Sequence, residues 1–127
     1  MTQRSALDEF KAVLGGAARA IAHDAEVELA FTADAPHAAG KHIKVPMPGR
    51  NLPRTQAMEA RGAADSYALQ LRHHNAAVHA RHMPTEPDAR ACYDAIERVR
   101  YEALGEREYA GIRDNLAAAI EQRTATD

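Results

Sequence analysis

Residues 54–81 read RTQAMEARGAADSYALQLRHHNAAVHAR, and this stretch decides the fold because its apolar side chains recur at helical spacing. A helix of about 28 residues would be about 40 Å long. Its expected buried stripe is formed by Ala57, Ala60, Ala64, Tyr67, Ala68, Leu71 and Val78. We expect any bend or break at Gly62, and His82-Met83-Pro84 ends the helix.

Upstream of this stretch, the sequence predicts one helix that begins after Ser5 and stops near His23-Asp24. Ser5 and Asp8 form a plausible capping pair at its start. The apolar residues at helical spacing are Leu7, Phe10, Val13, Leu14, Ala17, Ala18 and Ile21. This face should pack against the rest of the domain.

Between these helices, the apolar pattern changes to a period of two. The alternating apolar residues are Val27, Leu29 and Phe31 in one run, and Ile43 and Val45 in the next. A loop with Pro36 and Gly40 separates the runs. Their outward residues are acidic in the first run and basic in the second, which favours pairing. We therefore predict one antiparallel β-hairpin that packs its apolar face on helices.

Two more helices are predicted downstream. Thr85-Glu86-Pro87-Asp88 is a typical helix start, and Leu104-Gly105 should close that helix. Its expected inward face is Cys92, Ala95, Ile96, Val99 and Ala103. A last helix is expected over about 106–122 with Tyr109, Ile112, Leu116 and Ile120 inward, followed by a frayed tail from Arg123.

The predicted fold is thus α+β, mostly α, with four helices and one antiparallel β-hairpin after the first helix. Residues 1–127 are interpreted as a single domain with an ordered core over about 5–122. Twenty-nine residues are Ala. Because Ala buries little apolar area, we expect a thin core, closely packed helices and partial dependence on a partner for stability.

The composition argues against several classes of function. The net charge is −2 with interspersed signs, so nucleic-acid binding is not expected. No apolar run approaches the length of a membrane span, and no secretory signal is recognisable, so we predict a cytoplasmic protein. The one cysteine, Cys92, is interpreted as a buried structural thiol.

Four of the seven histidines, His73, His74, His79 and His82, fall within ten residues and raise a metal hypothesis. His79 and His82 can face the same side of a helix, whereas His74 and His79 lie about 140° apart on a straight helix. No Cys pair and no HExxH sequence accompanies them. Solvated or hydrogen-bonded histidines are the favoured interpretation, and His37 and His42 near the hairpin need no special role.

No catalytic constellation is complete, and we assign no catalytic, cofactor-binding or metal-binding residue. Asp94, Glu97 and Glu102 share their helix with Arg98 and Arg100, which predicts solvated ion pairs. Asp65, near Gly62, Ser66 and Arg61, is interpreted as a partly buried acid that bonds a neighbouring helix end or loop.

A resemblance to a known family runs along most of the chain. Its residues are Arg19-Ala20-Ile21-Ala22, Asp24-Ala25-Glu26-Val27-Glu28, Phe31, Arg61-Gly62, Ala64-Asp65-Ser66, Ala68-Leu69, Leu71, His74, His79, Ala89-Arg90-Ala91, Asp94-Ala95, Glu97, Arg100, Glu102-Ala103-Leu104-Gly105, Gly111 and Asn115-Leu116. In this order they resemble the amino-terminal region of the CobT subunit of aerobic, ATP-dependent cobaltochelatase. Asn75, His82 and Met83 do not contribute to the match.

The resemblance implies a non-catalytic scaffold or coupling domain that supports Co²⁺ insertion into hydrogenobyrinic acid a,c-diamide during vitamin B12 synthesis. It implies an AAA+ partner, CobS, a large chelatase partner, CobN, and a homo-oligomer compatible with a ring assembly. The whole complex, a ligase that forms nitrogen–metal bonds, would use ATP, Mg²⁺ and Co²⁺, and this domain would bind no cofactor and be inactive alone. The family's carboxy-terminal von Willebrand A-type domain is absent, so the chain looks like an excised domain or a truncated relative.

Two alternatives stay open. One is a self-sufficient metal-binding or metal-delivery module that uses the helix-borne histidines. The other is a helical interaction domain unrelated to cobalamin. Metal titration separates the first alternative from the scaffold, and gene neighbourhood separates the second.

Overall fold

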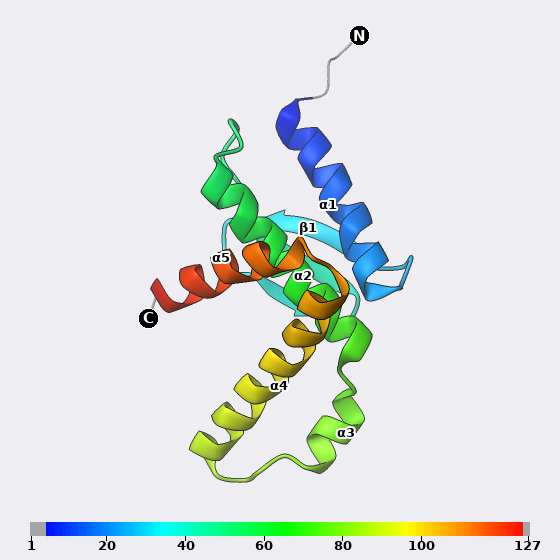
Figure 1. The fold of residues 1–127 in the computed structure, drawn as a ribbon, viewed down its shortest axis with the longest axis vertical. Helices are drawn as coiled ribbons and strands as arrows, with labels where there is room; N and C mark the ends of the chain where they lie inside the picture. The colour runs from blue at the N-terminus through cyan, green and yellow to red at the C-terminus, as the bar shows by residue number, and fades with distance from the viewer. Residues whose placement is uncertain (1–4, 126–127) are drawn as a thin grey trace.

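The computed structural model describes residues 5–125, which form five helices and a three-stranded sheet (Figure 1). The elements are α1 (Ala6–Ala22), β1 (Glu28–Thr32), β2 (His37–Ala39), β3 (His42–Pro46), α2 (Arg54–His73), α3 (Ala76–Arg81), α4 (Pro87–Glu108) and α5 (Ile112–Ala125). The predicted α+β, mostly helical class is confirmed. None of these helices, within the described residues, combines the length and apolar character that a membrane span requires.

Helix α1 begins and ends where the sequence predicts. Ser5 Oγ accepts a hydrogen bond from the Asp8 backbone N–H at 3.1 Å, and the Asp8 carboxylate accepts one from the Ser5 N–H. His23 adopts a left-handed conformation with φ of 55° and closes the helix. Leu14 is buried on the inner face. Val13, predicted to face inward, is 69% exposed.

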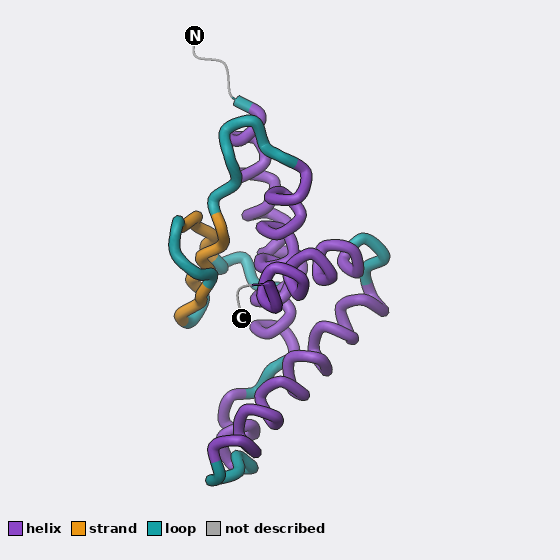
Figure 2. Tube along the Cα trace, turned by 90° about the vertical axis from the view of Figure 1, so that its left-hand side faces the viewer, coloured by secondary structure: helices purple, strands orange, loops and turns teal. Residues whose placement is uncertain are grey.

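The sheet has the order β1-β3-β2 and lies to one side of the helices (Figure 2). β1 is parallel to β3, so the predicted antiparallel pairing of these two strands is wrong. The reason is β2, which forms the antiparallel hairpin with β3 through a turn at Gly40, where φ is 58°. Two chain reversals therefore restore the direction of β1. The predicted cross-strand pairing is seen at one position, where Glu28 faces His42 and a carboxylate oxygen lies 3.2 Å from His42 Nδ1, whereas Lys44 faces Ala30.

Helix α2 is the centre of the domain. Ala60, Ala64 and Ala68 are fully buried, as the predicted stripe requires. Gly62 does not bend the helix but faces α5, where a Cβ would overlap the backbone oxygen of Asn115. The absence of a side chain thus permits direct contact between two helix backbones. The predicted close packing of helices is confirmed at this crossing.

The long helix predicted over 54–81 is interrupted at His74, not at Gly62. His74 has extended backbone angles, with φ of −89° and ψ of 132°. Asn75 then caps α3, because its side-chain oxygen accepts a hydrogen bond from the Val78 N–H at 3.0 Å. Residues 54–81 therefore form two helices, which accounts for the fifth helix.

Helix α4 starts one residue later than predicted, with Glu86 as its cap, and continues past Gly105 to Glu108. Gly105 does not end the helix. A Cβ there would collide with the side chain of Leu69, so this glycine allows α4 to pack closely on α2. Helix α5 begins later than predicted and continues to Ala125, and residues 126–127 of the predicted tail lie outside the described residues.

The first half of α4 and the whole of α3 project from the rest of the molecule (Figures 1 and 2). We call residues 74–100 the arm, and α1, the sheet, α2 and α5 the core. The predicted inward face of α4 is wrong within the arm, because Ile96 is 69% and Val99 67% exposed. Cys92 is exposed as well, not a buried thiol. The side of α4 that turns toward α3 carries polar residues instead. In α5, Ile120 is 44% exposed, against the prediction.

Candidate functional site

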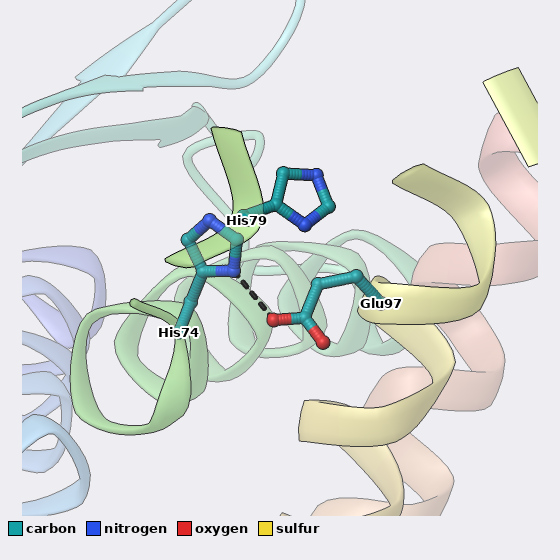
Figure 3. Close-up of side chains that lie close together, drawn as sticks. All are labelled: His74, His79 and Glu97. Atoms are coloured by element: carbon teal, nitrogen blue, oxygen red, sulfur yellow. Dashed lines mark hydrogen bonds and ion pairs between the residues drawn. The ribbon is translucent and has the colours of Figure 1, made fainter. Parts of the chain in front are cut away.

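Three side chains at the base of the arm form a candidate metal site. They are His74, His79 and Glu97, and one potential ligand atom from each lies within 4.8 Å of the others. Among the described residues this is the one group of three or more His, Cys, Asp or Glu side chains with such proximity. Figure 3 shows the two imidazole rings and the carboxylate converging from three different segments.

The helix break brings the two histidines together. On the straight helix that the sequence predicts, His74 and His79 would point in different directions. His74 instead ends α2 in an extended conformation, and His79 lies on α3 after the chain has turned. Their ring centroids are 4.8 Å apart at an interplanar angle of 65°. The sequence signal for this geometry was Asn75, a residue type that caps helices better than it continues them.

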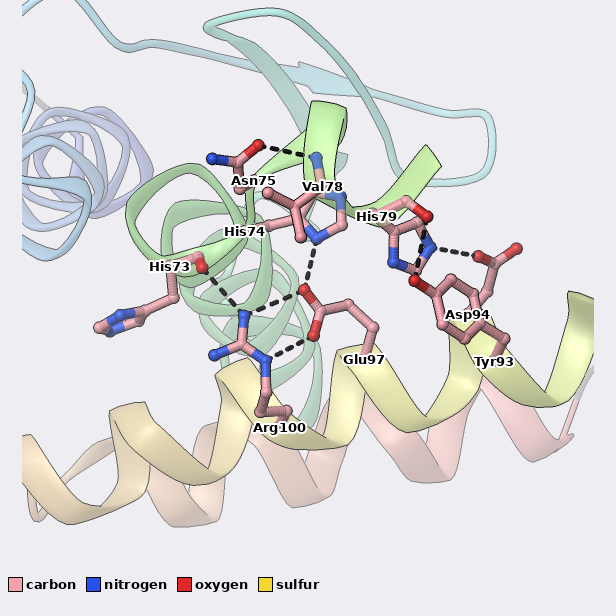
Figure 4. A network of polar contacts seen from close by, with 9 residues as sticks. All are labelled: His73, His74, Asn75, Val78, His79, Tyr93, Asp94, Glu97 and Arg100. Atoms are coloured by element: carbon pink, nitrogen blue, oxygen red, sulfur yellow. Dashed lines mark hydrogen bonds and ion pairs between the residues drawn. The ribbon is translucent and has the colours of Figure 1, made fainter. Parts of the chain in front are cut away.

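Contacts from α4 fix the position of His79 (Figure 4). Its Nε2 donates a hydrogen bond to Asp94 Oδ1 at 2.7 Å. Its ring stacks on Tyr93 with centroids 4.2 Å apart, and the Tyr93 hydroxyl donates to the His79 carbonyl oxygen at 2.9 Å. A carboxylate bonded to one ring nitrogen sets the tautomer and leaves the other nitrogen with a lone pair.

Glu97 is the most strongly perturbed carboxylate of the arm. Arg100 Nε donates to Glu97 Oε1 at 2.5 Å, and His74 Nδ1 lies 2.5 Å from Oε2. The pKa of Glu97 is lowered to about 2, first because Arg100 donates hydrogen bonds to it. The contact with His74 lowers it further. Arg100 also donates to the His73 carbonyl oxygen at 2.9 Å, which ties α4 to the end of α2. Glu97 thus pairs with Arg100 as predicted, but the pair is not the solvated one that the sequence predicted, because the Glu97 side chain is only 16% exposed and also contacts His74.

The cluster is shielded but reachable from solvent. The side chains of His74 and His79 are each 15% exposed, and that of Glu97 is 16% exposed. They border an open groove of about 710 Å³ that continues past Val99 to Ile120 on α5. A small ion or its hydrated form can therefore enter.

The other histidines do not join this cluster. His82, which the spacing paired with His79, is exposed beyond the end of α3. His73 Nε2 lies 3.5 Å from Glu108, at the last residue of α4 and outside the arm. His37 and His42 belong to β2 and β3, as predicted for residues of the hairpin. The structure therefore brings together His74 and His79, which the helical spacing separated, and leaves out His82, which the spacing placed on the same side as His79.

Asp65 occupies the interhelical position that the sequence predicts. It is 4% exposed and accepts a hydrogen bond from Asn115 Nδ2 of α5 at 3.1 Å. Burial raises its pKa to about 6, although the Asn115 hydrogen bond and Arg61 oppose this shift. Glu102 is likewise buried, accepts a hydrogen bond from Ser66 at 3.0 Å, and has a pKa raised by burial. Asp65 thus connects α2 to α5, and Glu102 connects α4 to α2.

Comparison with known protein families gives a match for this chain. Residues 4–127 match the family described as "Cobalamin biosynthesis protein CobT". The match extends over nearly the whole chain, and includes all three residues of the cluster. No solved structure matches the chain.

Proposed function

The chain belongs to the CobT family of cobalamin biosynthesis proteins, and from this premise we propose that it is a non-catalytic scaffold and coupling domain of cobaltochelatase. In this role it supports ATP-dependent insertion of Co²⁺, the substrate ion, into hydrogenobyrinic acid a,c-diamide in the cytoplasm. ATP hydrolysis belongs to the AAA+ subunit CobS, and chelation belongs to CobN. The family match over residues 4–127 is the observation that carries the proposal.

The exposed apolar face of α4 supports a docking role. It consists of Cys92, Ala95, Ile96, Val99 and Ala103, and we call it the α4 stripe. Ile96 and Val99 are 69% and 67% exposed, which leaves large aliphatic side chains in water. Burying these side chains against a partner would remove their apolar surface from water, which is favourable. An amphipathic helix that offers spaced aliphatic residues suits a groove on a folded partner, and we propose CobS as that partner.

Co-purification with CobS tests this proposal. We expect the double variant Ile96→Glu/Val99→Glu to lose binding by at least about tenfold, because two carboxylates cannot be buried in an apolar contact without cost. Val13→Glu is the matched control, since Val13 is also 69% exposed but lies on α1 in the core. Equal retention of CobS by the double variant and the control would refute docking through the α4 stripe.

A second candidate function is a self-sufficient metal-binding or metal-delivery module, which the cluster of His74, His79 and Glu97 favours. The two functions predict different losses of activity when the three side chains are removed. A scaffold that lacks these three side chains would still retain CobS and support cobalt insertion in the reconstituted complex. A delivery module would retain CobS but lose insertion at low Co²⁺ concentration.

A further inference from the structure

We propose that His74, His79 and Glu97 bind one divalent transition-metal ion of the Co²⁺ or Zn²⁺ class, and that this ion fastens α3 to α4. The inference depends on the geometry of the arm and not on the proposed scaffold function. Each ligand comes from a different segment: the end of α2, the middle of α3, and α4. An ion shared among them would therefore connect three segments with coordinate bonds.

The ligand atoms need only small movements to coordinate an ion. In a tetrahedral zinc site with bonds of about 2.0–2.1 Å, neighbouring ligand atoms lie about 3.3 Å apart. The pair of His74 Nδ1 and Glu97 Oε2, now 2.5 Å apart, would open, and the widest separation within the cluster, at most 4.8 Å, would close. Side-chain rotations are sufficient for shifts of this size. Any proton that His74 Nδ1 shares with Glu97 would leave to solvent as the ion binds.

The second layer of contacts suits a metal ligand. Because His79 Nε2 donates to Asp94, Nδ1 is the nitrogen left for an ion, and Figure 3 shows a nitrogen of this ring turned toward the space between His74 and Glu97. Carboxylate–histidine–metal arrangements of this kind orient the ring and raise its basicity. Tyr93 holds the same ring by stacking. The unoccupied coordination positions would be filled by water from the groove.

Charge and donor type decide which ions fit. Arg100 neutralises part of the negative charge of Glu97, but a carboxylate has about four acceptor positions, so Oε2 can accept from Arg100 and still bind an ion. Asp94 adds a further negative charge nearby. Two imidazoles with one carboxylate select Co²⁺ and Zn²⁺ over Mg²⁺, which prefers oxygen ligands.

The arm would gain order from such an ion. Helix α3 is six residues long, and none of its described residues is buried. A helix this short is marginal in water without tertiary contacts. Its side-chain contacts with α4 run through His79, Tyr93 and Asp94. An ion held by His79 and Glu97 would replace a few reversible hydrogen bonds with coordinate bonds.

Titration calorimetry of the purified chain with Co²⁺, Zn²⁺ and Mg²⁺ tests the site. We expect one bound equivalent of Co²⁺ or of Zn²⁺, and no saturable binding of Mg²⁺. His74→Ala, His79→Ala and Glu97→Gln should each abolish the saturable signal, and Asp94→Asn should weaken it by about 10–100-fold. His82→Ala is the matched control, because His82 is three residues from His79 yet outside the cluster. Loss of binding in His82→Ala, or its retention in His74→Ala, overturns the proposal.

A second test uses the unmodified chain, so its result does not depend on whether a substituted protein folds. Substoichiometric Co²⁺ should broaden the imidazole signals of His74 and His79 in the NMR spectrum of the unmodified chain before those of other histidines. Hydrogen exchange of the backbone amides of residues 76–81 should slow on addition of Zn²⁺, while α5 is unchanged. Broadening centred on His37 or His42, or unchanged exchange in α3 at saturation, would contradict the site. Neither result bears on CobS docking, so the two proposals can fail separately.

Discussion

The core and the arm of this small protein are held together by different forces. In the core, fully buried alanines on α2 and the Gly62 contact bring helix backbones close enough for dense apolar packing. In the arm, His74 at the end of α2 and His79 on α3 each contact a polar side chain of α4. Apolar packing resists local opening, whereas a few polar contacts near solvent do not. The arm is therefore the part of the molecule whose order can depend on a ligand or a partner.

The pKa values of two carboxylates, one in the core and one in the arm, are shifted in opposite directions. Asp65 in the core has its pKa raised to about 6, chiefly because burial disfavours its charged form. Glu97 in the arm has its pKa lowered to about 2, first because Arg100 stabilises its charged form. The core thus disfavours the charged form of Asp65, whereas the contacts of the arm stabilise the charged form of Glu97.

The largest expected effect compares two large aliphatic side chains. Leu116 is 1% exposed between α5 and α2, and Ile96 is 69% exposed on the arm. Leu116→Ala should lower the free energy of unfolding by about 2–5 kcal/mol because it leaves a cavity. Ile96→Ala should change it by less than about 0.5 kcal/mol in the isolated chain. Urea denaturation followed by circular dichroism measures both, and comparable losses would show that the arm packs as part of the core.

The second prediction compares Gly62, which is needed for a close helix contact, with Gly16, which is not. At Gly62 a Cβ would overlap the α5 backbone, whereas at Gly16 it would meet no described atom within 4 Å beyond its chain neighbours and the adjacent backbone of its own helix. Gly62→Ala should therefore destabilise the protein by about 1–3 kcal/mol. The same substitution at Gly16, inside α1, should stabilise it by about 0.5–1 kcal/mol. Thermal unfolding of the two variants should shift in opposite directions, and a stabilised Gly62→Ala protein would contradict the backbone contact.

The sequence predicts the core better than the arm for a physical reason. In the core, the helical stripe of α2, the α1 cap and the charge pairing of the strands are local patterns that tertiary packing reinforces. The parallel pairing of β1 with β3 depends on the short strand β2, and two of its three residues, Ala38 and Ala39, give no strong strand signal. In the arm, the apolar pattern of α4 predicts a buried face, but nothing among the described residues covers it.

The candidate metal site was predictable only in part. The residue types and the crowding of histidines are visible in the sequence. The grouping is not, because a straight helix separates His74 from His79 and favours His79 with His82. One capped break at Asn75 reverses that preference. Glu97 enters through a tertiary contact between segments 23 residues apart, which no local spacing reveals.

Asp65→Asn tests whether the core bears a buried charge. Because the folded pKa of about 6 lies above the unfolded value of 3.8, the stabilising contribution of Asp65 is present below that unfolded value and is lost as the pH rises through about 6. The variant removes the charge but keeps an oxygen for Asn115. It should be more stable than the parent by about 1–2 kcal/mol near pH 8 and equal to it near pH 4.

Urea unfolding across this pH range provides the measurement, with Asp34→Asn in an exposed loop as the control that should differ from the parent by less than about 0.5 kcal/mol. A stability gain for Asp65→Asn that is independent of pH would show that charge burial is not its cause.

The smallest expected effect compares two tyrosine hydroxyls that donate to backbone carbonyls. Tyr67 in the core donates to Pro36 at 3.0 Å, and Tyr93 in the arm donates to His79 at 2.9 Å. Tyr67→Phe should lower the free energy of global unfolding by about 0.5–1.5 kcal/mol. Tyr93→Phe removes an equivalent bond but keeps the stacked ring, so it should change global stability by less than about 0.5 kcal/mol.

The bond lost in Tyr93→Phe should appear instead in the local opening of α3. Hydrogen exchange resolved by residue measures this, and the amides of residues 76–81 should exchange about 2–10-fold faster while those of α5 are unchanged. If the arm and the core open together, the two variants will lose similar global stability and α5 will exchange faster in both. If exchange accelerates in α3 alone, the contact between His79 and α4 is where the molecule opens most easily. Tyr93 stacks on the same His79 ring that Asp94 orients, so removing its hydroxyl weakens that contact.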